Sequence, residues 1–176
     1  MTAGNPLSIV MLAPQHDRSA FDCGQDDLNR YLQQVASQHQ KKQVSRTWVA
    51  VRPSEPERIV GFYTTTLAEI SAEYFNPKDL KKLPKTSLPV ARLSRLAVGQ
   101  QYQGQHIGQR LLIDAIVRTA RLLEDFAVVG MVVDAKDEAV SRYYQHFGFV
   151  PWQDDALKLY MPAQALLDVY AAVIGE

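Results

Sequence analysis

The chain has 176 residues, 47% of them hydrophobic, and its 19 basic and 19 acidic side chains cancel. This length and composition argue against disorder and predict one domain with a sizeable core. Because the net charge is zero, a nucleic-acid partner would need a local basic patch. Cys23 is the single cysteine, which excludes an intramolecular disulfide and a cysteine-based zinc cluster.

The N-terminal sequence predicts a cytoplasmic protein. "MTAGNPLSIVMLAPQHDRS" has no basic n-region and only a short apolar run, so no signal peptide is expected. No stretch of the sequence is long enough to cross a bilayer, so no membrane partner is expected either. We also expect no metal site.

The first half of the chain predicts a strand, a helix and a hairpin. Residues 7–13 are typical of a strand, and residues 25–42 of a helix with acidic side chains in its first turn and lysines in its last. Residues 46–53 and 58–70 are rich in β-branched and aromatic side chains and predict a β-hairpin. A lysine-rich connector, residues 76–89, follows.

The second half alternates strands and helices, and it predicts strands at 90–98, 128–135 and 157–162 and helices at 107–123, 137–148 and 163–174. The first of these helices has a predicted buried stripe of Ile107, Leu111, Ala115, Leu122 and Leu123. Gly148 is expected to end the second as a C-terminal cap.

This order of elements predicts an α/β (α+β) fold, with a mixed, mostly antiparallel sheet flanked by helices. Its one strong βαβ unit has a glycine-bearing loop at the carboxyl end of the first strand, where open α/β sheets bind ligands. The sequence contains neither the dinucleotide fingerprint G-x-G-x-x-G nor a P-loop.

That loop lies in "YQGQHIGQRLL", residues 102–112, between a predicted strand and the first turn of a helix. Unpaired N–H groups at a helix start can hold an anion such as a phosphate. The same spacing is also compatible with an ordinary turn that contains glycine. The loop by itself leaves both interpretations open.

Three segments, "RLAV", "QGQHIG" and "YYQHFGF", together resemble the GNAT (Gcn5-related) N-acetyltransferases. The pyrophosphate loop of that family, Q/R-x-x-G-x-G/A, matches Gln103, Gly104, Gln105, His106, Ile107 and Gly108. Further segments, from "FDCGQDDLNRYL" through "LPVARLSRLAV", resemble the bacterial GNAT toxins encoded beside ribbon-helix-helix antitoxins. Those toxins acetylate the amino group of aminoacyl-tRNA, and the match is colinear over residues 21–149.

The resemblance implies a single GNAT acetyltransferase domain over residues 1–176, with the acyl-CoA N-acyltransferase fold and acetyl-CoA as co-substrate. Backbone N–H groups of Leu96, Ala97 and Val98 would polarise the thioester carbonyl. Loop amides from Gln105 to Gly108 would hold the pyrophosphate. Tyr144 would be the catalytic acid that protonates the departing thiolate, with Tyr143 as its packed neighbour.

One loop position departs from the family pattern. His106 occupies the fourth position, where glycine is usual. We expect its φ and ψ to be ordinary helical angles and its side chain to point outward, so that cofactor binding survives. A glycine would instead have allowed strained angles and a close approach of the backbone to phosphate.

An aminoacyl-tRNA partner requires basic side chains that face its phosphates. The candidate residues are Lys41, Lys42, Arg46, Arg92 and Arg95, with the connector lysines as either tRNA contacts or solvated surface. An arginine within a strand needs a partner, which is either an acid of the fold or a ligand phosphate. The resemblance also implies a ribbon-helix-helix antitoxin and a homodimer.

Two other functions compete with the toxin. One is a GNAT enzyme that acetylates a polyamine, a drug or a protein amine. The other is a non-catalytic module that binds acetyl-CoA or a partner, for which His106 in the phosphate loop is the argument.

Overall fold

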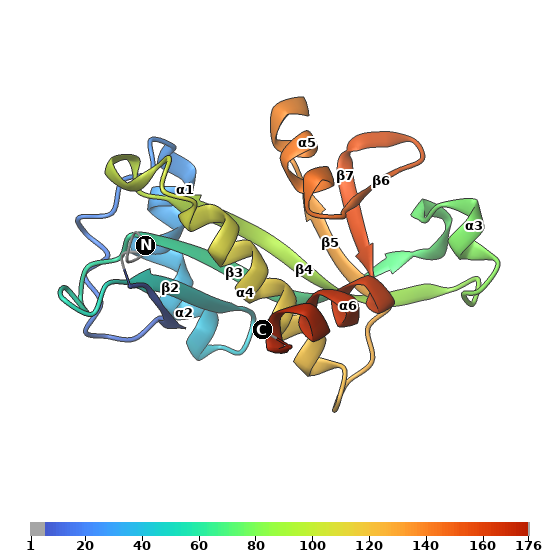
Figure 1. Ribbon diagram of the computed structural model, residues 1–176, viewed down its shortest axis with the longest axis horizontal. Helices are drawn as coiled ribbons and strands as arrows, with labels where there is room; N and C mark the ends of the chain where they lie inside the picture. The colour runs from blue at the N-terminus through green and yellow to red at the C-terminus, as the bar shows by residue number, and fades with distance from the viewer. Residues whose placement is uncertain (1–5, 176) are drawn as a thin grey trace. The chain divides into compact units, whose positions relative to one another are not determined.

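The computed structural model describes residues 6–175 (Figure 1). The chain divides into two compact units, each made of separate segments. Unit 1 contains the chain up to Thr66 and Ser94–Ala115, and unit 2 contains Leu67–Leu93 and the chain from Ile116 onward. Both units contain residues of strand β3 (Gly61–Ser71), strand β4 (Ser87–Val98) and helix α4 (Ile107–Leu122). The single domain expected over residues 1–176 stays a prediction.

Seven strands form one sheet in the order β1-β2-β3-β4-β5-β7-β6. Strands β4 and β5 are parallel, whereas β1–β2, β2–β3, β5–β7 and β6–β7 are antiparallel, so the predicted mixed sheet is confirmed. The strands are β1 (Ser8–Met11), β2 (Arg46–Val51), β3 (Gly61–Ser71), β4 (Ser87–Val98), β5 (Gly130–Asp134), β6 (Val150–Trp152) and β7 (Asp155–Pro162).

The helices are α1 (Asp26–Arg30), α2 (Ala36–Lys41), α3 (Pro77–Leu80), α4 (Ile107–Leu122), α5 (Glu138–His146) and α6 (Ala163–Ile174). The helix predicted over residues 25–42 is interrupted by a π-helical stretch, Tyr31–Val35, between α1 and α2. Tyr31 and Leu32 in that stretch are buried. The sequence does not reveal this π-helical turn. It adds one residue to the helix, and the spacing of apolar residues around it still matches a helix.

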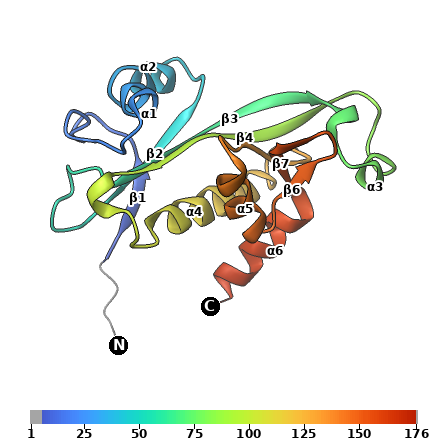
Figure 2. The same ribbon diagram turned by 90° about the horizontal axis from the view of Figure 1, so that it is seen from above.

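In unit 1, α1 and α2 lie on one face of β2 and β3 and α4 lies on the other (Figure 2). The core on the α1–α2 side includes Leu32, Val49 and Phe62, none of which exposes side-chain surface. Gly61 lets α4 approach β3, because a Cβ there would lie 2.9 Å from Leu111 Cδ1 and 3.0 Å from the Ala97 oxygen. A side chain at this position would therefore push the helix away from the strand.

The buried stripe of α4 differs from the prediction at its C-terminal end. Ile107, Leu111 and Ala115 are buried as expected, but Leu122 and Leu123 are only half-buried. The helix instead buries adjacent pairs of residues, and these pairs recur every four positions along α4. The second members of the pairs are Leu112, Ile116 and Ala120. A helix that is covered over a broad face buries more than the single stripe that periodicity predicts.

In unit 2, α5 packs on β6 and β7, and α6 packs on β5 and β7. The lysine-rich connector contains α3, whose first turn is capped by the Asn76 side chain accepting from Lys78 N at 3.0 Å. The Tyr160 hydroxyl, from β7, donates to the Asp79 carboxylate and so ties α3 to the sheet. Within the described part of the chain, no helix is both long and apolar enough to span a membrane.

Candidate active site

The glycine-bearing loop joins β4 to α4 within unit 1. A short 3-10 helix, Gln100–Tyr102, follows β4, and the Gln100 N–H donates to the Asp22 oxygen at 2.8 Å. The Gln103 side chain turns back toward the fold, where its Nε2 donates to the carbonyl oxygens of Val98 (3.1 Å) and Cys23 (3.4 Å). These contacts fix the start of the loop before α4 begins.

Gly104 leaves the loop open to a ligand. It adopts φ +80°, the left-handed region that glycine enters without steric cost, and a Cβ there would have no neighbour within 4 Å. The first hydrogen bond of α4 joins Arg110 N to His106 O at 3.2 Å. The N–H groups of Ile107 and Gly108 precede it and have no partner within the helix, as anion binding requires. These groups fit the pyrophosphate of acetyl-CoA.

The expectation for His106 was wrong. Its φ is +60°, a left-handed conformation rather than the ordinary helical one. Only its outward direction agrees with the expectation, since the side chain is exposed. Histidine is enriched several-fold among the few non-glycine residues found in this region, which makes it one of the tolerable replacements. The loop thus keeps the backbone shape that a glycine would give and stores some strain.

The predicted thioester-binding segment, Leu96 to Val98, lies at the carboxyl end of β4. The parallel pairing of β4 with β5 covers Ala91–Leu93 and ends where Leu93 faces Val133. Leu96, Ala97 and Val98 therefore lie beyond that ladder. Ala97 is buried, and its neighbours on either side are half-buried.

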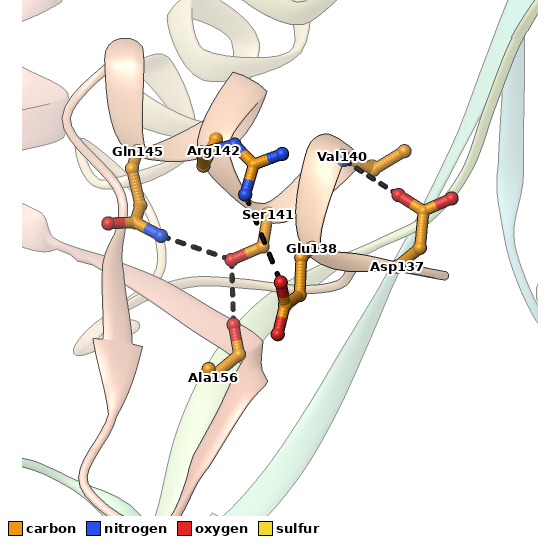
Figure 3. Close-up of polar contacts among 7 residues, drawn as sticks. All are labelled: Asp137, Glu138, Val140, Ser141, Arg142, Gln145 and Ala156. Atoms are coloured by element: carbon orange, nitrogen blue, oxygen red, sulfur yellow. Dashed lines mark hydrogen bonds and ion pairs between the residues drawn. The ribbon is translucent and has the colours of Figure 1, made fainter.

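Helix α5 of unit 2 positions Tyr144, and its N-terminal half is anchored by side chains (Figure 3). The Asp137 carboxylate caps the helix by accepting from Val140 N at 2.9 Å. Ser141 Oγ donates to the Ala156 oxygen of β7 at 2.6 Å and accepts from Gln145 Nε2 at 3.1 Å. The helix is thus hydrogen-bonded to the sheet one turn before Tyr144.

The C-terminal end of α5 confirms the predicted glycine cap. Gly148 has φ +98°, and its N–H donates to the Gln145 oxygen at 3.0 Å. The Phe149 N–H donates to the Tyr144 oxygen at 3.2 Å, and the two rings meet edge to face at 5.6 Å. These two hydrogen bonds and the ring contact form a Schellman motif. Tyr144 is therefore fixed by the turn that ends its helix.

The two tyrosines of the "YY" pair differ in environment. Tyr144 is 6% exposed, whereas Tyr143 is 36% exposed. Burial, followed by the neighbouring Tyr143, raises the pKa of Tyr144 to about 12. Among residues 6–175 no hydrogen-bond partner of the Tyr144 hydroxyl is found. The phenol keeps its proton at physiological pH and has it available for donation. The assignment of Tyr143 as the packed member fits less well, since Tyr143 is the more exposed of the two.

The candidate tRNA-binding residues differ in how the fold engages them. Lys41 and Lys42, at the end of α2, are exposed. Arg46 donates to the Gln40 oxygen (3.1 Å) and to Gln43 Oε1 (2.5 Å), and so covers the C-terminal end of α2. The two arginines of β4 both have partners in the fold: Arg92 lies 3.4 Å from the Asp134 carboxylate, and the Arg95 guanidinium lies 3.7 Å from the centre of the Tyr31 ring.

One contact at the loop was missed from the sequence. Arg52 follows β2 by one residue, and its Nη2 donates to Gln105 Oε1 at 2.8 Å. The two residues are 53 positions apart. No periodicity or local motif connects them, and only the pairing of β2 with β3 and the course of β4 bring them together.

This chain is similar to one enzyme family and to known bacterial toxins. The model of the acetyltransferase (GNAT) domain matches residues 43–151. A tRNA-acetylating toxin of Mycobacterium tuberculosis is 30% identical over 160 residues, which cover 91% of this chain and 92% of that protein. A probable toxin TacT of Sinorhizobium fredii is 26% identical over 156 residues, covering 84% of this chain and 86% of that protein.

Solved structures of similar proteins confirm the fold. AtaT complexed with acetyl-methionyl-tRNAfMet superposes with a TM-score of 0.86 at 23% identity, covering 94% of this chain and 99% of that one. AtaTR bound with acetyl-CoA gives 0.80 at 24% identity, covering 93% and 98%. The family match and the 30% identical relative are decisive: this chain belongs to the GNAT acetyltransferases and is an acetyl-CoA-dependent N-acetyltransferase.

Proposed function

We propose that this protein is a toxin that acetylates the α-amino group of an aminoacyl-tRNA and thereby blocks translation in the cytoplasm. The observation that carries the proposal is the 30% identity with a tRNA-acetylating toxin over 91% of this chain. The similarity extends well beyond residues 43–151, which the general acetyltransferase model matches. It therefore includes parts of the chain that the common cofactor-binding core does not explain.

Acetyl-CoA supplies the activated acetyl group, and the residues of this chain fit its binding. We assign the pyrophosphate to the loop Gln103–Gly108, where Gly104 leaves open space and the first N–H groups of α4 precede the first hydrogen bond of the helix. We assign the thioester carbonyl to the backbone of Leu96–Val98, beyond the β4–β5 ladder. Donors fixed in advance stabilise the negative charge that develops on that oxygen.

The acceptor amine needs little help from the protein. An α-amino group has a pKa of about 8, so a useful fraction is neutral at cellular pH. A strong catalytic base is therefore not required, and the remaining demand is a donor for the departing thiolate.

Tyr144 is the proposed donor. Its pKa of about 12 lies well above the ordinary thiol value of about 8.5, so complete proton transfer to the thiolate is unfavourable. The Tyr144 hydroxyl, for which residues 6–175 offer no hydrogen-bond partner, can instead stabilise the thiolate by a charge-assisted hydrogen bond, which is worth more than a neutral one. The proton that neutralises the thiolate then comes ultimately from the acylated amine, which must lose one.

The basic candidates for the tRNA remain Lys41, Lys42, Arg46, Arg92 and Arg95. The two lysines are exposed at one helix end and can reach phosphates directly. The ion pair of Arg92 with Asp134 is solvent-accessible, with side-chain exposures of 33% and 59%, so it is weak enough to exchange for a phosphate. We further propose a ribbon-helix-helix antitoxin as the inhibitory partner and a homodimer as the working form.

The test combines an acetylation assay with expression in bacteria. Purified protein is given acetyl-CoA with a labelled acetyl group and either a set of aminoacyl-tRNAs or polyamines. Tyr144→Phe should lower the transfer rate to aminoacyl-tRNA by about 10²- to 10⁴-fold, as loss of a general acid or its equivalent does. Expression of the wild type should arrest growth, and expression of Tyr144→Phe should not.

Tyr143→Phe is the matched control, because it removes the neighbouring, more exposed hydroxyl. It should keep activity within a few-fold. Full activity of Tyr144→Phe on charged tRNA would show that the assigned donor is wrong. Acetylation of polyamines without acetylation of any aminoacyl-tRNA would replace the toxin by an ordinary acetyltransferase.

A further inference from the structure

The loop Gln103–Gly108 lacks a strong cation of its own. Its first position is Gln103, and that side chain is used inside the fold, where it donates to the carbonyl oxygens of Val98 and Cys23. It is therefore not free to donate to a ligand. A pyrophosphate carries more negative charge than backbone N–H groups neutralise, so phosphate sites commonly add an arginine or a lysine.

Arg52 lies beside this loop, although it comes from the end of β2. Its Nη2 donates to Gln105 Oε1 at 2.8 Å, and its guanidinium carbon lies 5.1 Å from the centre of the Tyr102 ring. Both partners belong to the segment that leads into α4. All three residues are part of unit 1.

The charge of Arg52 is not matched within the part of the chain that the structure describes. Its side-chain partners there are a neutral amide and an aromatic ring. Its Nε is buried and has no hydrogen-bond partner. Other arginines differ in this respect: Arg58 lies 3.4 Å from Glu55, and Arg92 lies 3.4 Å from Asp134. Arg52 as a whole is half-buried, and a buried N–H group without an acceptor, such as its Nε, is unfavourable. An anion that accepts from this guanidinium would satisfy both the N–H group and the charge.

We propose that Arg52 binds a phosphate of acetyl-CoA and supplies the positive charge that the loop Gln103–Gly108 lacks. The planar fork of a guanidinium matches two phosphate oxygens, and the contacts to Tyr102 and Gln105 hold it in place before the ligand arrives. This inference rests on the proposed function only in taking acetyl-CoA as the ligand of the loop.

Isothermal titration calorimetry with acetyl-CoA tests the proposal on the full chain. Arg52→Gln should weaken binding by about tenfold or more, and should make the affinity less dependent on salt, because one charged contact is lost. Arg52→Lys should lie between the two, since it keeps the charge without the fork. Arg58→Gln, which removes a nearby exposed arginine, should bind within about twofold of the wild type.

Two further measurements separate a phosphate contact from a structural role. Gln105→Ala removes the side-chain partner but not the charge, so it should retain the salt dependence of the wild type. Arg52→Gln could instead keep the salt dependence of the wild type and lose as much affinity as Gln105→Ala. That result would mean that Arg52 only holds Gln105 in place, and it would overturn the proposal. Titration with acetyl-CoA that lacks its 3′-phosphate shows which phosphate Arg52 contacts. If Arg52→Gln still binds this ligand more weakly than the wild type does, the contact is to the pyrophosphate. If the two proteins bind it equally, the contact is to the 3′-phosphate.

The thermal melting temperature of each variant reports whether it folds. If Arg52→Gln does not fold, Arg52→Lys becomes the test. If Arg52→Lys binds acetyl-CoA with the affinity and the salt dependence of the wild type, the proposed contact through the guanidinium fork is overturned. Failure of the premise that acetyl-CoA is the ligand of this loop looks different, because the wild type itself would then not bind acetyl-CoA. Failure of the toxin assignment looks different again, because the wild type would bind acetyl-CoA but acetylate no aminoacyl-tRNA. Wild-type binding that Arg52→Gln retains within twofold overturns this inference alone.

Discussion

The turn before α4 and the turn after α5 each contain a residue in the left-handed region, but the two turns use different residue types there. At the end of α5 the residue is Gly148, with φ +98°, and the turn is closed by two backbone hydrogen bonds and the Tyr144–Phe149 ring contact. Before α4 the residue is His106, with φ +60°, and its side chain is exposed.

The difference separates a turn that serves the fold from one that faces a ligand. The α5 turn ends in the buried Phe149, and its glycine avoids left-handed strain at a position that fixes Tyr144. The α4 loop contains a strained histidine whose side chain is exposed, and a Cβ at Gly104, two residues earlier, would have no neighbour within 4 Å. Strain of this kind collects at binding sites, where the surrounding structure holds the backbone in place.

The largest expected effect concerns the buried tyrosine at the α5 turn. Its pKa is raised from about 10 to about 12 by burial, so the folded state holds the proton more tightly than the unfolded chain. The resulting stability is fully present below pH 10 and is lost as the pH rises toward 12. A shift of this size corresponds to about 2 to 3 kcal/mol of unfolding free energy.

Urea unfolding of the wild type and Tyr144→Phe between pH 8 and 11 measures about half of this contribution, because pH 11 lies one unit below the pKa of about 12. Burial also raises the pKa of Tyr160, so the wild type loses stability in alkali for more than one reason. The variant should lose less than the wild type over that range. Equal losses would mean that Tyr144 is more accessible to water than its 6% exposure indicates.

The second effect tests the glycine of the α5 turn. Gly148→Ala should lower the unfolding free energy by about 1 to 2 kcal/mol, because an L-residue at φ +98° is strained. Space is not the cause, since the added Cβ would lie at an ordinary 3.5 Å from Met161 Cε. Acetyl-CoA affinity should not change.

Gly148→Asn is the control for backbone strain. Asparagine enters the left-handed region more readily than alanine, so this variant should lose less stability despite its larger side chain. A greater loss for asparagine than for alanine would point to packing rather than to φ.

The smallest effect comes from the histidine before α4. His106→Gly should raise the unfolding free energy by about 0.5 to 1 kcal/mol, because relief of left-handed strain exceeds the entropy that glycine adds to the unfolded chain. Acetyl-CoA affinity should stay within a few-fold, since the loop keeps its conformation. The measurements are urea unfolding and calorimetry on the same samples.

His106→Val should change the unfolding free energy in the opposite direction to His106→Gly. A β-branched residue tolerates the left-handed region worst, so it should destabilise the protein and weaken acetyl-CoA binding together. If valine is tolerated as well as histidine, the loop is not held at φ +60° in solution, and the contrast between the two turns disappears.

Much of the molecule was determined by local sequence. The hairpin of β2 and β3, the helix α6 and the cap at Gly148 follow from β-branched runs, apolar periodicity and a glycine, all of which act over a few residues. The parallel β4–α4–β5 unit was predictable for the same reason. The short strand β6 was not, because three residues that include Pro151 carry no alternation.

The tertiary structure alone decided the chemistry of individual side chains. The sequence marked Tyr144 through the family resemblance, but its burial and raised pKa depend on β7, the α5 turn and Phe149. His106 was expected in a helical conformation, and the turn before α4 placed it in the left-handed region instead. Arg52 meets Gln105 only because the sheet brings together strands distant in the chain. Local patterns set backbone elements over a few residues, whereas environment and partners are fixed by contacts between elements far apart in sequence.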